Sequence, residues 1–205
     1  VHTGIPHGPP LAKVDELISE MREKRADTVL AVGGGSVIDA AKAAAVLAPI
    51  PDARVRPYFT GTLPIQAPGL RVIAAPTTAG TGAEITKNSV LTDPERRIKQ
   101  SLRSPFMVPA VAVIDPELTL SMSAGLTAAS GLDALTQAVE SFLSANANAT
   151  SRALARDAVA RLMKNLAPAC RAPDDQIFGT RTAEGSMLSA MAFSQTGLGV
   201  VHGLA

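Results

Sequence analysis

The stretch TVLAVGGGSVIDAAKAAAVLA, residues 28–48, decides the fold class. Its first five residues form a short apolar run, which is typical of a strand buried on both faces. Three glycines, residues 33–35, end that run. Ser36 then opens an alanine-rich segment with strong helix propensity, and Pro49 ends it. A strand, a glycine turn and a helix in this order predict an α/β protein with an open sheet.

The segments around this stretch continue the α/β pattern. Residues 11–25 place apolar side chains at helical spacing and charges on the opposite face. Residues 50–70 are rich in Pro and Gly, which indicates a surface excursion. Two more buried strands and a β-hairpin are predicted from apolar and alternating runs: strands at RVIAA (71–75) and AVAVI (110–114), and a hairpin of ITKNSVLT (85–92) with RIKQSLR (97–103).

The character of the sequence changes near residues 120–128. Beyond this point, alanine-rich segments predict long helices over 124–143, 148–166 and 176–196. We therefore expect an α/β domain with an open, mainly parallel sheet over 1–125, followed by the start of an all-helical domain over 126–205.

Composition excludes several classes of partner. The chain has 205 residues, a formal net charge of +1 and only 3% aromatic residues, which does not favour a nucleic-acid surface. The apolar runs are interrupted well before the roughly 20 residues that a membrane span needs. A single cysteine, Cys170, cannot form an internal disulfide and fits a reducing compartment. We therefore expect a cytoplasmic protein that binds neither nucleic acid nor membrane.

Two loops that follow predicted strands are candidates for phosphate binding. Residues 33–36 supply close backbone approach and unpaired N–H groups before a helix, although a plain tight turn remains the alternative. Residues 77–84, TTAGTGAE, bring three hydroxyls and two glycines to the end of the next strand. Ligands of open α/β sheets gather at this end of the strands. Together the two loops suggest one extended ligand such as a dinucleotide.

A third candidate site lies on the first long helix. Asp133 and Gln137 stand four residues apart and therefore share a helix face, which is a workable half of a metal site. An ordinary amphipathic helix is the alternative. His202 lies far along the chain among apolar residues, where a structural histidine is the simpler interpretation from the sequence alone.

Four blocks of sequence resemble the iron-containing (group III) alcohol dehydrogenase family. They are AVGGGSVIDAAKA, APTTAGTGAEITKNSVLTD, DPELTLSMSAGLTAASGLDALTQAVESFLS and GLGVVHGLA, in the family's order and across essentially the whole chain. The resemblance implies a fragment that lacks both ends of a family member, including the first strand of the dinucleotide domain. It implies hydride transfer between NAD or NADP and a small alcohol or aldehyde, assisted by iron or zinc, in a homo-oligomer, most simply a dimer.

The resemblance also assigns roles to individual residues. Those matching the family's cofactor contacts are Gly34, Gly35, Ser36, Asp39, Thr77, Thr78, Thr81, Val90 and Lys99. Those matching its metal ligands are Asp133, Gln137 and His202. No catalytic residue is assigned beyond these.

The sequence departs from the family pattern at Gln137, where most members have a histidine ligand. An amide oxygen binds iron or zinc less well than imidazole does. Two alternatives therefore remain open. One is a metal-independent enzyme resembling maleylacetate reductases, and the other is a nucleotide-binding fragment without activity.

Overall fold

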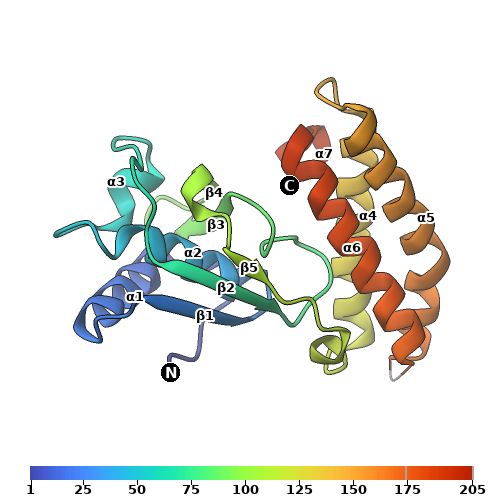
Figure 1. Ribbon diagram of the computed structural model, residues 1–205, viewed down its shortest axis with the longest axis horizontal. Coiled ribbons are helices and arrows are strands. Elements are labelled where there is room, and N and C mark those ends of the chain that lie inside the picture. Colours follow the sequence, from blue (N-terminus) through green and yellow to red (C-terminus); the bar gives the residue numbers. More distant parts are fainter. Residues whose placement is uncertain (174, 205) are drawn as a thin grey trace. The chain divides into compact units, whose positions relative to one another are not determined.

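The computed structural model describes residues 1–173 and 175–204, and the chain divides into two compact units (Figure 1). Unit 1 comprises Val1–Ala75 and Thr86–Val113. Unit 2 comprises Pro76–Ile85 and Ile114–Ala205. The threonine-rich loop predicted to bind a ligand thus belongs to unit 2, although the strands on either side of it lie mainly in unit 1.

Unit 1 is an α/β unit, as the sequence predicts. Strands β1, β2 and β5 lie side by side in that order, and β2 pairs with β5 in parallel, with Ile73 opposite Val111. Strands β3 and β4 form the predicted antiparallel hairpin, with Val90 opposite Ser101. The elements are α1 (Leu11–Glu23), β1 (Thr28–Gly33), α2 (Gly35–Leu47), α3 (Val55–Phe59), β2 (Arg71–Pro76), β3 (Asn88–Asp93), β4 (Ile98–Arg103), the 3₁₀ turn η1 (Pro105–Met107) and β5 (Val111–Ala112).

The prediction that β1 is buried on both faces is wrong. Ala31 is 3% exposed, whereas its neighbours Leu30 and Val32 are 65% and 51% exposed. Successive side chains of a strand point to opposite faces, so only the face that carries Ala31 is covered. Helix α2 packs against β1, and within the described residues nothing shields the other face to the same extent.

The core of unit 1 lies between its helices and the hairpin. Helix α2 is buried almost all round, because its alanines let neighbouring segments approach closely. A Cβ on Gly69, for example, would lie 2.2 Å from the backbone oxygen of Ala45. The predicted surface excursion over 50–70 is wrong in part, because α3 inserts Val55 and Phe59 into this core.

Unit 2 is a helical bundle, which also agrees with the prediction (Figure 1). Helix α5 runs past the predicted end at residue 166 and accommodates Pro168 near its C-terminus. Glycines let the helices pack closely: a Cβ on Gly131 would lie 2.2 Å from a methyl carbon of Leu166. The elements are the 3₁₀ turn η2 (Pro116–Thr119), α4 (Ala124–Leu143), α5 (Ala149–Arg171), α6 (Gln176–Thr196) and α7 (Val200–Leu204).

Each long helix of unit 2 begins at a capping side chain. Ser123 caps α4, Asn148 caps α5 in a reciprocal capping box with Ser151, and Asp175 caps α6. Such caps satisfy N–H groups that the first turn of a helix leaves unpaired. Across the described part of the chain, no helix combines the length and apolar character that crossing a membrane requires.

Candidate functional site

The glycine turn of unit 1 leads directly from β1 into α2. Gly34 is the N-cap of α2, so the expectation that Ser36 opens the helix is off by two residues. Ser36 instead lies in the first turn, where its Oγ accepts a hydrogen bond of 3.2 Å from the backbone N–H of Gly8. The first-turn N–H groups of a helix lack intrahelical acceptors and carry the positive end of the helix dipole. This end of α2 is therefore suited to an anionic group.

Asp39 is held one turn further along α2 by a buried ion pair. One carboxylate oxygen lies 3.3 Å from Lys42 Nζ, and the other accepts the backbone N–H of Val90 at 3.0 Å. Lys42 is fully buried and also donates to the backbone oxygen of Thr86 at 3.2 Å. Asp39 and Lys42 thus join helix α2 to the segment that forms the hairpin.

The electrostatics of this pair are dominated by burial. Removal from water raises the pKa of Asp39, and the attraction of Lys42 and the hydrogen bond from Val90 offset this only in part. Two of the residues matched to cofactor contacts, Asp39 and Val90, thus lie in hydrogen-bond contact. Lys99 lies on β4 opposite Thr92 and is exposed.

The threonine-rich loop packs tightly against the helices of unit 2. A Cβ on Gly80 would lie 2.6 Å from the Cβ and backbone oxygen of Ser130, and one on Gly82 would lie 2.4 Å from the Cβ of Ala190. Gly82 also has a φ of +66°, a region that favours glycine. Packing against α4 and α6 accounts for both glycines, which the sequence had suggested as points of close approach for a ligand.

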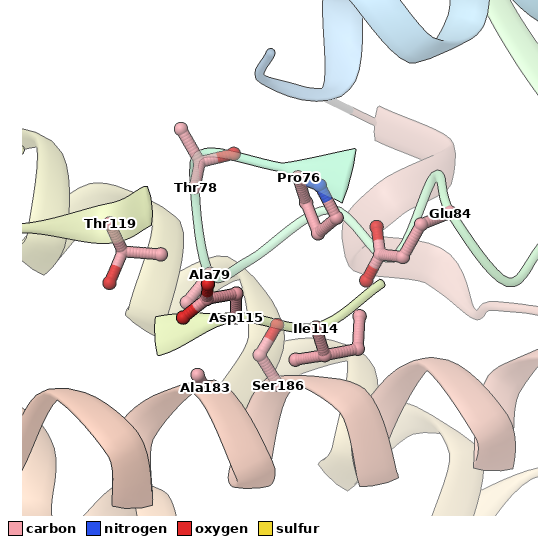
Figure 2. Close-up of a pocket in the computed structure, with 9 residues that line it drawn as sticks. All are labelled: Pro76, Thr78, Ala79, Glu84, Ile114, Asp115, Thr119, Ala183 and Ser186. Carbon is pink, nitrogen blue, oxygen red and sulfur yellow. The ribbon is translucent and has the colours of Figure 1, made fainter. Parts of the chain in front are cut away.

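Polar side chains of the loop face a small hollow within unit 2 (Figure 2). Thr78 and Glu84 come from the loop, Asp115 from the segment before η2, and Ser186 from α6. Thr77 is partly exposed, and Thr81 is exposed, with its hydroxyl oxygen 3.4 Å from the backbone nitrogen of Ala83. The three threonines thus have different surroundings.

The three residues matched to metal ligands come together in unit 2. Asp133 and Gln137 lie one turn apart on α4, with 3.0 Å between Asp133 Oδ2 and Gln137 Nε2. His202 comes from α7, and its Nε2 lies 3.0 Å from Asp133 Oδ1. Asp133 therefore lies at the centre of this cluster, with one oxygen toward each partner.

Gln137 supplies the observation that bears most directly on metal binding. Its side chain is 3% exposed, and its Oε1 is buried without a hydrogen-bond partner. An unpaired buried oxygen is costly unless a further group binds it. One carboxylate, one imidazole and one free amide oxygen form a donor set that a divalent cation accepts. Within the described residues, no group of three or more His, Cys, Asp or Glu is placed to hold a metal ion, so a metal site here would depend on the Gln137 amide as its third donor.

Glu140 is the residue of this site that the sequence analysis did not assign. It lies seven residues after Asp133 and three after Gln137, on the same face of α4. Its Oε2 lies 2.5 Å from His202 Nδ1, and its Oε1 accepts the backbone N–H of Val201 at 2.8 Å. The helical spacing could have placed Glu140 on the same face as Asp133 and Gln137. Nothing in the sequence indicated that α7 packs against this face of α4.

The two carboxylates beside His202 favour its protonated form, and His202 in turn favours the ionised form of Glu140. Burial disfavours the imidazolium form, but hydrogen bonds to Glu140 and Asp133 outweigh it and raise the pKa of His202. Burial likewise acts to raise the pKa of Glu140, yet hydrogen bonds from Gly199, His202 and Val201 outweigh it and lower that pKa.

Two family models account for nearly the whole chain. The model described as iron-containing alcohol dehydrogenase matches residues 1–116, and the C-terminal model of the same family matches residues 127–205. Among curated relatives, long-chain-alcohol dehydrogenase 1 of Geobacillus thermodenitrificans is 40% identical over all of this chain and 52% of its own length. Lactaldehyde reductase of Escherichia coli is 35% identical over all of this chain and 53% of its own length.

Solved structures show the same fold. Sulfoacetaldehyde reductase from Bifidobacterium kashiwanohense, in complex with NAD⁺, superposes with a TM-score of 0.92 at 33% identity, over 96% of this chain and 52% of that one. An iron-containing alcohol dehydrogenase from Thermotoga maritima superposes with a TM-score of 0.90 at 35% identity, over 99% of this chain and 55% of that one. The chain thus spans about half the length of the relatives it matches. It belongs to the iron-containing alcohol dehydrogenase family.

Proposed function

We propose that the protein to which this chain belongs is an oxidoreductase that transfers a hydride between NAD or NADP and a small alcohol or aldehyde. The observation that carries the proposal is the convergence of Asp133, Gln137 and His202, with a buried amide oxygen left unpaired. The family has this chemistry, and the relatives include a long-chain-alcohol dehydrogenase and a lactaldehyde reductase. We further propose a cytoplasmic homo-oligomer, with a dimer as the simplest form.

Each candidate residue has a proposed role. The α2 N-terminus at Gly34, Gly35 and Ser36 binds the pyrophosphate of the cofactor. Asp133, Gln137 and His202 hold a divalent metal. The remaining cofactor contacts proposed are Asp39, Thr77, Thr78, Thr81, Val90 and Lys99, within an α/β domain over 1–125 that precedes a helical domain over 126–205.

The contribution of the chain itself is binding and orientation. When bound, the nicotinamide would supply a hydride acceptor and the divalent ion would polarise the substrate oxygen. Gly35 allows close backbone approach, and the first-turn N–H groups of α2 offset phosphate charge. Asp133 supplies negative charge to the metal position, while His202 and Gln137 supply neutral donors.

Substitution of Gly35 by valine tests the cofactor assignment. A branched side chain at this position blocks the approach of the pyrophosphate, so the affinity for NAD⁺ or NADP⁺ should fall at least about tenfold, or about 1.4 kcal/mol. Calorimetric titration of both dinucleotides measures the change, with circular dichroism as the check on folding. A folded G35V protein with unchanged affinity contradicts the role of the turn.

Substitution of Gln137 by histidine tests the metal assignment. Imidazole is a better donor to borderline divalent ions than a neutral amide, so Q137H should bind zinc and iron more tightly than the wild type. Competition with a chromogenic chelator measures both dissociation constants. Thr136→Val, one residue away on α4, is the control and should leave them unchanged. Equal metal affinity in Q137H and wild type would favour the metal-independent alternative. A rate of hydride transfer that a chelator does not lower would then establish that alternative.

A further inference from the structure

We propose that Glu140 is a positioning residue that fixes the tautomer of His202, so that Nε2 is the nitrogen free to bind the metal. The inference rests on the proposed metal site, but it concerns a residue to which no ligand role is assigned. A metal binds imidazole only through an unprotonated ring nitrogen, and which nitrogen this is depends on the hydrogen bond that the other one makes.

Glu140 faces the nitrogen of His202 that points away from the cluster. Glu140 Oε2 lies 2.5 Å from Nδ1, whereas Asp133 Oδ1 lies 3.0 Å from Nε2. The Glu140 side chain is 9% exposed and that of Asp133 is 37% exposed. Charge-assisted hydrogen bonds are stronger where water is excluded. Both ring nitrogens face a carboxylate oxygen, so the imidazolium form donates to both. When the ring is neutral, its single proton stays at the shorter and more buried contact, on Nδ1 toward Glu140, and Nε2 is the nitrogen free to bind a metal ion.

The orientation of the Glu140 carboxylate is restricted by a second set of contacts. Its other oxygen, Oε1, accepts the backbone N–H of Val201 at 2.8 Å. The chain also passes very close to it, since a Cβ on Gly199 would lie 2.8 Å from the same oxygen. Both oxygens of Glu140 thus act as acceptors at the same time, one toward the backbone and one toward the ring.

Because both oxygens of Glu140 accept hydrogen bonds, substitution by glutamine separates its effect on the His202 tautomer from its effect on the fold. Glutamine has nearly the shape of glutamate but offers only one oxygen, and its other terminal group is an NH₂ donor. If the oxygen keeps the Val201 N–H, the NH₂ group faces Nδ1 and forces the ring proton onto Nε2. The fold is then preserved while His202 presents a protonated nitrogen to the metal position.

The test compares wild type, Glu140→Gln and Glu140→Ala, with Glu117→Gln as a matched control on the exposed turn η2 of the same unit. The first readout is the ring nitrogen spectrum of His202 by two-bond ¹H–¹⁵N NMR in metal-free protein, at a pH where the ring is neutral. We expect a proton on Nδ1 in the wild type and in E117Q, and on Nε2 in E140Q. A wild type protonated on Nε2, or an E140Q protein protonated on Nδ1, overturns the proposal.

The second readout is the dissociation constant for zinc, measured with the chain of 205 residues by chelator competition. Loss of a partner of this kind weakens metal binding by about 10- to 100-fold, which we expect for E140Q and E140A but not for E117Q. A purely structural Glu140 would instead leave zinc affinity unchanged in a folded E140Q protein, and that result overturns the proposal. If no form binds zinc, the proposed metal site fails while the tautomer measurement still decides the role of Glu140.

Discussion

Replacing Lys42 with methionine should destabilise unit 1 by about 3–5 kcal/mol, the usual cost of leaving a buried charge without its partner. Methionine has a similar length and fills the fully buried space, so the loss is one of charge and of the hydrogen bond to Thr86, and not of packing. Asp39 would keep only the N–H of Val90 from the two contacts described for its carboxylate. Urea unfolding followed by circular dichroism measures the change.

The pH dependence and a double substitution identify the cause. Without Lys42 the pKa of Asp39 rises further above its ordinary value of 3.8, because burial is no longer offset. A raised folded-state pKa stabilises the fold below the unfolded value and loses that contribution as the pH rises through the folded one. The defect in K42M should therefore shrink as the pH is lowered.

Adding Asp39→Asn to Lys42→Met should recover most of the loss at neutral pH, since no buried charge remains. Lys24→Met, at an exposed lysine on the same unit, is the control and should have far less effect. A defect in K42M that neither low pH nor Asp39→Asn relieves would mean that Lys42 stabilises the fold through packing or its hydrogen bond to Thr86, and not through its charge pair with Asp39.

Replacing Gly82 with alanine should destabilise unit 2 by about 2–5 kcal/mol. The left-handed backbone at φ +66° costs a residue with a Cβ about 1–2 kcal/mol, and forcing a methyl group into a filled core costs about 1–3 kcal/mol more. The new Cβ would lie 2.4 Å from the Cβ of Ala190, which is bonded directly to the helix backbone and cannot rotate away, and 3.2 Å from a ring carbon of Phe193. Thermal unfolding measures the loss.

Gly179→Ala is the matched control for this substitution. Gly179 lies inside α6, and a Cβ there would meet no atom within 4 Å. Alanine at such a position in a helix is favoured over glycine by about 0.5–1 kcal/mol, so this variant should be more stable than the wild type. If the two variants are destabilised alike, the contacts of Gly82 are not the cause.

The parts of the fold that the sequence predicts are those governed by local periodicity. Helices α4 and α6 begin and end at the predicted residues, and a capping side chain marks the start of each. The hairpin of β3 and β4 follows from two alternating runs joined by a turn. The exposed face of β1 could not be predicted, because an apolar run does not reveal which of its faces another element covers.

Contacts between residues far apart in the sequence could not be predicted from local periodicity. Lys42 looks like an ordinary charge in an alanine-rich helix, and only the fold brings it to Thr86, 44 residues away. Gly80 and Gly82 look like ligand-approach glycines until the helices against which they pack are known. Glu140 shares a face with Asp133 in any helix, yet its meeting with His202, 62 residues away, depends on the return of the chain.

The threonine-rich loop is a short excursion of unit 2 bounded by strands of unit 1, so the chain passes from one unit to the other three times. A gene dissected between Val113 and Ile114 would therefore not yield two self-sufficient halves. The second half would lack the loop that covers Ser130 on α4 and Ala190 on α6. Expression of the helical unit by itself requires a circularly rearranged gene or a grafted copy of residues 76–85.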